Sequence, residues 1–373
     1  MVARFEDRLG LLQRVLPAYR APFFDALAGA CAGGLSLFAG LPRADESIAT
    51  TTQLHVAKYA PANNLQFVSP SSPFYVCYQR GLTHWLAAWN PEALILEANF
   101  RYLSSPTAIR WMHKRNRPVI GWGLGAPLDR GPFSALRERF LRQFDAMIAY
   151  SARGAEQYAA CGIPVDKIFV AQNAVATAPK HSLPFRGAAF GEGLLSPTQP
   201  VVLFVGRLQV RKRIPSLLKA CAQLPEQLKP RLVIVGDGPE LDNLRSQAQR
   251  LYPSAEFPGA KHGTELVDYF RAADLFVLPG TGGLAVQEAM SYGLPVIVAQ
   301  GDGTQDDLVR VGNGWQIPPD DDFALFFALQ EALRDVTRLR KMGAESYRIV
   351  ADEINLERMV AVFIEALNSV RSN

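Results

Sequence analysis

Short apolar runs alternate with helical patterns along most of the chain, most regularly in its second half. There, apolar runs stand at 201–205, 232–235, 275–278 and 296–298, with a shorter strand candidate at 256–257. Helical spacing occurs near 214–222, 239–251, 264–272 and 284–292, and again near 322–335, 337–350 and 355–370. A run of four or five apolar residues fits a strand buried on both faces and is too short for a helix. Strands separated by helices predict parallel β-α-β units.

The first half shows the same alternation less regularly. Strands are predicted near 35–38, 64–69, 74–78, 93–96, 119–121, 146–150 and 168–171, and helices near 22–31, 83–89, 103–116, 132–144 and 152–160. From Pro179 to Pro200 the chain is rich in Pro, Gly and Ser without sustained periodicity, which is typical of a domain boundary. We therefore predict α/β domains at 1–178 and 200–354, a linker at 179–199, and a C-terminal helix at 355–373 that packs back on the first domain.

Composition narrows the class of protein. A chain of 373 residues favours two domains, and 49% hydrophobic with 20% charged residues is typical of a globular protein. The four cysteines are far apart and show no CxxC spacing, which argues for a reducing compartment and against a zinc or disulfide framework. The first residues contain no apolar signal-peptide core, and no apolar run approaches the roughly 18–20 residues of a membrane span. We expect a cytoplasmic protein.

Positive charge is concentrated between residues 101 and 142. Nine basic residues stand there against only Asp129 and Glu138: Arg101, Arg110, Lys114, Arg115, Arg117, Arg130, Arg137, Arg139 and Arg142. Two basic helices could dock on an anionic partner, such as the inner membrane face or a phosphorylated acceptor, or could simply be a solvated face. No recognition helix or RNA-binding signature supports a nucleic-acid partner.

The stretch 275–298, LFVLPGTGGLAVQEAMSYGLPVIV, predicts a strand, a glycine-rich turn, a helix and a second strand. The helix begins near Leu284, and the N–H groups of its first turn, aided by the helix dipole, suit a phosphate. Gly282 and Gly283 allow the backbone to turn tightly and approach a ligand. Glu288 lies one turn further along, where its carboxylate could accept hydrogen bonds from ribose hydroxyls. An ordinary β-α-β crossover would show the same glycines, so this stretch alone does not decide.

The second informative stretch is 203–212, LFVGRLQVRK. Its strand ends at Gly206, and Arg207 and Lys212 follow at the sheet edge where open α/β sheets bind ligands. Arg207 and Lys212 could together clamp a diphosphate. The nearby VGDGPE at 235–240 is not a dinucleotide fingerprint, because Leu241 stands where the third glycine belongs, which excludes a dehydrogenase. No GxxxxGK[ST] occurs, which excludes a P-loop enzyme.

Four motifs in order resemble the retaining glycosyltransferases of family 4: VGRLxxxxK, VGDGP, AADLFVLPG with GGLAVQEAMSYGLPVI, and DDLV with GNG. The resemblance is strongest over 200–320. It implies the GT-B fold, in which two Rossmann-like domains face each other across a cleft, the second binding the nucleotide sugar and the first the acceptor. Carried over, Arg207 and Lys212 would hold the donor diphosphate with the amides of Gly282, Gly283 and Leu284. Glu288 would bind the ribose as the second glutamate of a Glu-x7-Glu motif.

The chain departs from that family at four places. Gly280 stands where the first glutamate of the motif would help to position the transferred sugar. The later sugar-binding loop is altered, and we place Asp306 or Asp307 near the sugar. On the acceptor side, a glycine-rich loop is replaced by 16–27, which leaves Tyr19 and Arg20 before a helix, and a customary histidine is replaced by the run from Gly121 to Gly125. Within that run, Gly123 allows close approach, and Trp122 could stack on a sugar or pack in the core.

These observations predict a glycosyltransferase that moves a sugar from a nucleotide donor, UDP- or GDP-linked, to a glycan, glycolipid or lipid-linked acceptor with retention of configuration. The five histidines show no metal spacing, so neither a metal nor another cofactor is expected. Two alternatives remain open. Gly280 would also suit a scaffold that binds a nucleotide sugar or glycan without transferring it, and the fold would also suit a sugar-nucleotide epimerase.

Overall fold

The computed structural model describes residues 4–371 except 47, 69–71, 73, 127–132, 181–182, 184–198, 283 and 302. The chain forms two compact units, one made of residues 1–175 with 356–373, and the other of residues 176–355. We call them unit 1 and unit 2. Most of the predicted linker at 179–199 lies outside the described residues.

Unit 2 contains a six-stranded parallel sheet in the order β12-β11-β10-β13-β14-β15. Its strands are β10 (Val201–Val205), β11 (Arg231–Val235), β12 (Glu256–Gly259), β13 (Leu275–Leu278), β14 (Val296–Ala299) and β15 (Gly314–Ile317). Numbered within the unit, this order is 3-2-1-4-5-6, the doubly wound arrangement of dinucleotide-binding folds. Strand order therefore reverses between β10 and β13, and the carboxyl ends of these two strands mark the expected ligand edge.

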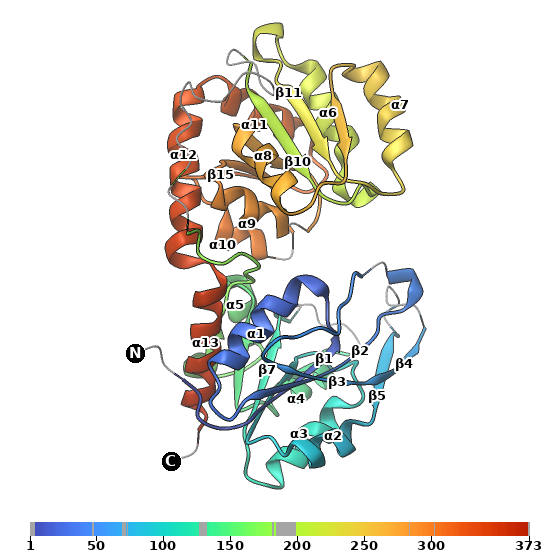
Figure 1. Cartoon of the computed structure of the whole chain (residues 1–373), viewed down its shortest axis with the longest axis vertical. Helices are drawn as coiled ribbons and strands as arrows, with labels where there is room; N and C mark the ends of the chain where they lie inside the picture. Colours follow the sequence, from blue (N-terminus) through green and yellow to red (C-terminus); the bar gives the residue numbers. More distant parts are fainter. Residues whose placement is uncertain are drawn as a thin grey trace. The chain divides into compact units, whose positions relative to one another are not determined.

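Helices cover both faces of this sheet, as Figure 1 shows. They are α6 (Ile214–Gln223), α7 (Leu241–Leu251), α8 (Thr264–Ala272), α9 (Leu284–Ser291), α10 (Thr304–Leu308), α11 (Asp322–Leu333) and α12 (Val336–Arg348), with the short turns η4 (Val210–Lys212), η5 (Glu226–Leu228) and η6 (Ile349–Glu353). α6 packs against α7 and α11, while α9 packs against α12. The four central strands β11, β10, β13 and β14 are buried on both faces, which explains their continuous apolar runs.

Unit 1 contains a seven-stranded parallel sheet in the order β3-β2-β1-β6-β7-β8-β9. Its strands are β1 (Leu9–Val15), β2 (Leu35–Gly40), β3 (Lys58–Pro61), β6 (Ala93–Glu97), β7 (Val119–Gly123), β8 (Ala146–Ala149) and β9 (Ile168–Val170), and β4 (Asn63–Phe67) pairs with β5 (Val76–Arg80) beside it. Its helices are α1 (Ala21–Gly29), α2 (Leu82–Trp89), α3 (Ser105–His113), α4 (Ser134–Leu141), α5 (Ala152–Ala160) and α13 (Leu356–Ser369), with turns η1 (Ala18–Arg20), η2 (Ala44–Glu46) and η3 (Val165–Lys167). Strand order reverses here between β1 and β6.

Helix α13 packs against α1 on one face of the unit 1 sheet (Figure 1). Its Phe363 is fully buried, with ring centroids 4.9 Å from Phe23 and 5.0 Å from Trp122. Helix α13 therefore completes the core of the unit that contains the first residues of the chain.

Three features of unit 1 differ from the sequence prediction. The central strand β1 was not predicted, although Leu9–Leu12 are buried, and neither was the edge strand β3. β4 and β5 correspond to the predicted strands at 64–69 and 74–78, but they form an antiparallel pair rather than parallel units. Among the described residues, no helix is long and apolar enough to cross a membrane.

Candidate functional site

The two glycine-rich turns that leave β10 and β11 pack directly on each other. A Cβ added at Gly236 would collide with the carbonyl oxygen of Gly206, and one at Gly238 would lie 2.7 Å from the Leu208 nitrogen. Leu208 also donates its backbone N–H to the Asp237 carbonyl at 2.9 Å. The glycines of VGDGP therefore allow close backbone approach at the ligand edge, as expected for a tight strand-to-helix turn.

Gly280 is equally constrained, and this explains the departure from the family motif. A Cβ at this position would overlap the carbonyl oxygen of Arg211 and lie 2.7 Å from Cα of Lys212. The next residue, Thr281, donates its N–H to the same Arg211 carbonyl at 3.1 Å. With turn η4 packed against the loop after β13, this backbone has no space for a glutamate at position 280.

Lys212 lies at the centre of this arrangement. Only 8% of the residue is exposed, and its ammonium group donates to the carbonyl oxygen of Thr281 at 2.8 Å. Nζ would lie 3.3 Å from a Cβ at Gly282, whose φ of 79° favours glycine. Burial, together with the nearby charge of Arg211, lowers the pKa of Lys212 to about 8. The ligand edge thus holds a buried ammonium group with a lowered pKa, next to the loop that leads into α9.

Helix α9 carries the other predicted donor-binding residues. Leu284 is its first residue and is exposed, and Gly283 lies outside the described residues. The Glu288 carboxyl is half-buried, burial raises its pKa, and it has no hydrogen-bond partner within the described part of the chain. The preceding residue, Gln287, anchors the helix: its amide accepts from Ala176 N–H at 3.1 Å and donates to the Ile354 carbonyl at 2.6 Å. Lys212 and α9 are therefore held on well-anchored elements.

Arg207, Asp306 and Asp307 lie around the same edge. Arg207 follows β10, its side chain is exposed, and among the described residues it has no ion-pair partner. Asp306 and Asp307 lie on α10, after β14, and are half-buried. The structure thus places Arg207 and Lys212 after the same strand, while the two aspartates follow a strand two positions away in the sheet.

A pocket opens at the carboxyl ends of β13, β14 and β15, and residues of η4 form part of its lining. It is lined by Arg211, Arg213, Glu240, Asn243, Gly280, Thr281, Gln300 and Asp320, among others. Arg207, Lys212, Asp306 and Asp307 do not line it. Arg213 pairs with Asp320 at 3.0 Å and Asp322 at 2.9 Å, which fixes one wall. The sequence analysis missed Arg211 and Arg213, although the RKR run at 211–213 was a visible signal.

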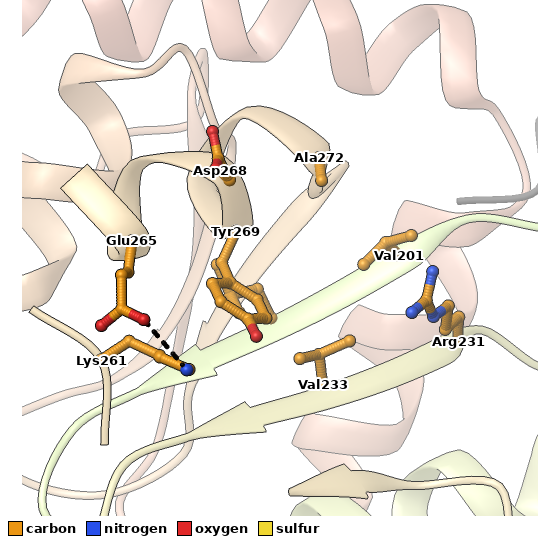
Figure 2. Close-up of a pocket in the computed structure, with 9 residues that line it drawn as sticks. Val201, Arg231, Val233, Lys261, Glu265, Asp268, Tyr269 and Ala272 are labelled. Carbon is orange, nitrogen blue, oxygen red and sulfur yellow. Dashed lines mark hydrogen bonds and ion pairs between the residues drawn. The ribbon is translucent and has the colours of Figure 1, made fainter. Parts of the chain in front are cut away.

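Figure 2 shows a second pocket of unit 2, between α8 and strands β10 and β11. The first and third residues of both strands line this pocket, so it lies over the face of β10 and β11, and none of the residues that follow β10 or β13 at the ligand edge line it. Its cations are paired within the protein: Lys261 with Glu265 at 3.3 Å and Arg231 with Glu256 at 2.5 Å. We therefore place the candidate donor site at Lys212 and α9 rather than here.

The acceptor-side candidates gather at the ligand edge of unit 1. Tyr19 is 45% exposed, whereas Arg20 is 5% exposed and lies 5.4 Å from the Tyr19 ring, 5.3 Å from that of Trp122 and 5.4 Å from that of Tyr150. Trp122 is only 1% exposed, packed between core phenylalanines, so the suggestion that its ring stacks on a sugar is wrong. Gly123 ends β7, and a Cβ there would lie 2.7 Å from the Tyr158 hydroxyl.

The described residues contain no group of three or more His, Cys, Asp or Glu side chains arranged to hold a metal ion. The polar groups at both ligand edges are instead cations, amides, single carboxylates and helix N–H groups. Such groups suit a negatively charged or hydroxyl-bearing ligand.

Comparison with solved structures defines the class of fold. The structure of HepE from Anabaena in complex with UDP superposes with a TM-score of 0.69 at 18% identity, covering 97% of this chain and 99% of that chain. Two α/β units with parallel sheets, matched over their whole length to such a neighbour, have the GT-B fold of glycosyltransferases.

The family comparison is more specific. Residues 186–349 match the family described as "Glycosyl transferases group 1". A sulfoquinovosyl transferase of Arabidopsis thaliana is 38% identical over 115 residues, which are 30% of this chain and 21% of that protein. A GDP-mannose-dependent alpha-mannosyltransferase of Mycobacterium tuberculosis is 37% identical over 123 residues, 32% of this chain and 30% of that protein. The chain thus spans about a fifth to a third of the length of these curated relatives.

Proposed function

We propose that this protein is a glycosyltransferase of family 4 that moves a sugar from a nucleotide donor to a glycan, glycolipid or lipid-linked acceptor. The observation that carries the proposal is the buried ammonium group of Lys212, which lies against the turn from Gly280 to Gly282 that precedes α9. Arg207 follows β10, the same strand that leads to Lys212. Together with the match to the group 1 family, this cluster supports a diphosphate site.

The donor is proposed to be a UDP- or GDP-linked sugar, bound without a metal. The UDP complex of HepE and the GDP-mannose dependence in the name of the mycobacterial relative support these two bases. Lys212, Arg207 and the amides of Gly282, Gly283 and Leu284 would neutralise the diphosphate, and Glu288 would accept hydrogen bonds from the ribose. Asp306 or Asp307 is proposed to contact the transferred sugar.

We further propose that transfer retains the anomeric configuration. In a front-face transfer, the acceptor oxygen bonds to the anomeric carbon as the bond from that carbon to the phosphate oxygen breaks, and the departing phosphate takes the acceptor proton. The protein then has to stabilise negative charge on the leaving diphosphate, which Arg207 and Lys212 would do from fixed positions. Losing one such group typically costs about 10²–10³ in rate.

A peripheral position at the inner membrane face is proposed from the basic region 101–142. On α4 and just after it, Arg139 and Arg142 are exposed beside Leu136, which is 55% exposed. Exposed cations beside an exposed apolar side chain suit an anionic lipid surface. A lipid-linked acceptor used in polysaccharide synthesis would be met at such a surface.

Thermal unfolding with UDP, GDP, ADP, dTDP and CMP tests the donor site. A nucleotide at 100 times its dissociation constant should stabilise the protein by about 2.7 kcal/mol. We expect a response to UDP or GDP that is lost in Arg207→Ala and kept in Arg250→Ala, a control at an exposed arginine of α7. Transfer from the corresponding sugar nucleotides would then be followed by NMR of the product's anomeric proton.

The outcomes separate the alternatives. Absence of any nucleotide response would refute the donor site and favour a scaffold of another kind. Nucleotide binding without transfer to any acceptor would favour the non-catalytic alternative. Interconversion of the donor sugar without transfer would identify an epimerase, and an inverted product would refute retention alone.

A further inference from the structure

The ligand edge of unit 1 contains a row of three polar side chains on adjacent strands. Glu97 is the last residue of β6 and pairs with Trp122 of β7. On its other side, β1 pairs with β6 up to Leu12 and Leu96, so the next residue, Gln13, is set beside Glu97. Directly paired residues of parallel strands project to the same face, and neighbouring strands are about 4.8 Å apart.

Both neighbours of Glu97 carry a buried donor without a partner. Gln13 is 7% exposed and Trp122 is 1% exposed, and neither Gln13 Nε2 nor Trp122 Nε1 has a hydrogen-bond partner within the described part of the chain. Buried donors are nearly always satisfied, since leaving one unpaired costs about 1–3 kcal/mol. Two orphaned donors on either side of one carboxylate therefore indicate a ligand rather than a packing accident.

Glu97 itself is only half engaged. Its Oε2 accepts the backbone N–H of Arg14 at 2.5 Å, whereas Oε1 has no hydrogen-bond partner among the described residues. Glu97 is half-buried, whereas the two donor atoms beside it are buried. The row thus carries an acceptor oxygen on β6, and the two strands that flank β6 carry the unpartnered N–H donors.

The chemistry of the row selects a neutral hydroxyl-bearing ligand. A phosphate would be repelled by the Glu97 carboxylate, and a cation by the N–H donors and by Arg20, which has no carboxylate partner within the described part of the chain. A hydroxyl group can donate to Glu97 and accept from Gln13 or Trp122 at the same time. The exposed ring of Tyr19, beside Arg20, offers an apolar face for a sugar ring.

We propose that Gln13, Glu97 and Trp122 form a hydroxyl-binding subsite for a sugar ring in unit 1, with Glu97 as the hydrogen-bond acceptor. The proposal rests on the proposed transferase function in assigning this sugar to the acceptor. It also gives Trp122 a role through its indole N–H instead of its ring face.

Ionisation of Glu97 makes the subsite sensitive to pH. The groups that act on it are Arg14 of β1, Arg20 of η1, Cys77 of β5, and the two tyrosines Tyr102 and Tyr150. Burial raises the pKa of Glu97 to about 7 against the lowering effect of the two arginines. The carboxylate, which is the better acceptor, therefore forms between about pH 6 and 8, and sugar affinity should rise over that range.

The test follows the Trp122 indole N–H by ¹H–¹⁵N NMR, with its cross-peak assigned in Trp122→Phe. The probes are the methyl glycosides of α-glucose, α-mannose and β-galactose. We expect one of them to shift the cross-peak saturably in the wild-type protein, more tightly at pH 8 than at pH 6. Glu97→Gln, whose amide oxygen can keep the Arg14 hydrogen bond, should weaken the apparent affinity at least about ten-fold and remove the pH dependence. Glu92→Gln, just before the same strand, should change neither.

Gln13→Met separates binding from folding. It removes an orphaned buried donor, so the unfolding temperature should stay equal or rise while sugar affinity falls. A cross-peak that no glycoside moves, or that moves equally in Glu97→Gln, would overturn the subsite and leave ordered water as the partner of these donors. UDP and GDP binding, measured on the same samples, distinguishes the two failures: retained nucleotide binding without a sugar response overturns only the subsite, and a sugar response without nucleotide binding overturns only the donor site.

Discussion

Gly280 offers the sharpest test of the donor edge, because two interpretations predict opposite results. If the chain had merely lost the family's glutamate, Gly280→Glu should restore sugar contacts and raise transfer. The packing predicts the reverse. A Cβ at 280 lies 2.7 Å from Cα of Lys212, while ordinary contacts begin at 3.4 Å, so the backbone of η4 has to move by at least 0.7 Å. The carbonyl of Arg211 has to move further, because its oxygen is closer still.

The expected loss can be worked out from the contacts that this movement breaks. They are the neutral hydrogen bond from Thr281 N–H to the Arg211 carbonyl at 3.1 Å and the charged one from Lys212 to the Thr281 carbonyl at 2.8 Å. A neutral hydrogen bond contributes about 0.5–1.5 kcal/mol and a charged one about 1.5–3 kcal/mol. Gly280→Ala and Gly280→Glu should therefore lower the free energy of unfolding by roughly 2–4 kcal/mol and weaken UDP or GDP binding at least about ten-fold.

Urea unfolding and nucleotide titration check both effects. Gly29→Ala is the matched control, because nothing lies within 4 Å of a Cβ at that position, and it should unfold like the wild type. Wild-type stability together with increased transfer in Gly280→Glu would refute the packing argument and show that η4 adapts freely.

Three further predictions concern other parts of the molecule. UDP or GDP affinity should fall above pH 8, by up to about ten-fold per unit, because the pKa of Lys212 is about 8 and only its protonated form attracts the diphosphate; Lys212→Met should bind weakly at every pH. Phe363→Ala should lower the free energy of unfolding of unit 1 by about 3–5 kcal/mol in urea, since it empties a fully buried site between α1 and the sheet. Arg139→Glu with Arg142→Glu should weaken sedimentation with liposomes that contain anionic lipid.

Each of these three has a matched control. Lys219→Met replaces an exposed lysine of α6 and should leave the pH dependence of nucleotide binding as in the wild type. If Lys212→Met also kept the wild-type pH dependence, the fall in affinity above pH 8 would not come from Lys212. Phe323→Ala, at a 79% exposed residue, should unfold like the wild type, and equal effects of the two alanine variants would contradict the core position of Phe363. Charge reversal of Arg245 and Arg250 on α7 should not change binding of the protein to liposomes. If liposome binding survives charge reversal of Arg139 and Arg142, these two residues belong to a solvated face that does not contact lipid.

The sequence was most informative where one physical constraint dominated. Parallel strands buried on both faces require continuous apolar runs, so the strands at 201–205, 232–235, 275–278 and 296–298 were predicted almost to the residue. β1 was missed because the polar Gln13 and Arg14 interrupt its carboxyl end. Both residues stand at the carboxyl end of the strand, next to the ligand edge, where polar residues commonly replace apolar ones for functional reasons.

Contacts between distant segments could not be predicted from local patterns. The glycine at 280 looked like a lost glutamate, and only the packing of η4 shows that any side chain there would collide. Trp122 lies near the carboxyl end of a strand and stands beside glycines, as a sugar-stacking residue would, but the burial of its ring depends on Phe23 and Phe363, which lie far away in the chain. The pairing of Glu97 with Trp122 is likewise a matter of strand register.

The position of α13 has a consequence for synthesis of the chain. Unit 2 consists of the continuous segment 176–355, whereas the core of unit 1 includes Phe363 from the last helix. On the ribosome, domains usually fold in the order in which they emerge. Here unit 2 can finish folding first, while unit 1 keeps the apolar faces of α1 and its sheet uncovered until residues 356–369 appear. A nascent chain of this protein would therefore present its first half to chaperones for the longest time. A premature stop within α13 would destabilise unit 1, although most of that unit is synthesised first.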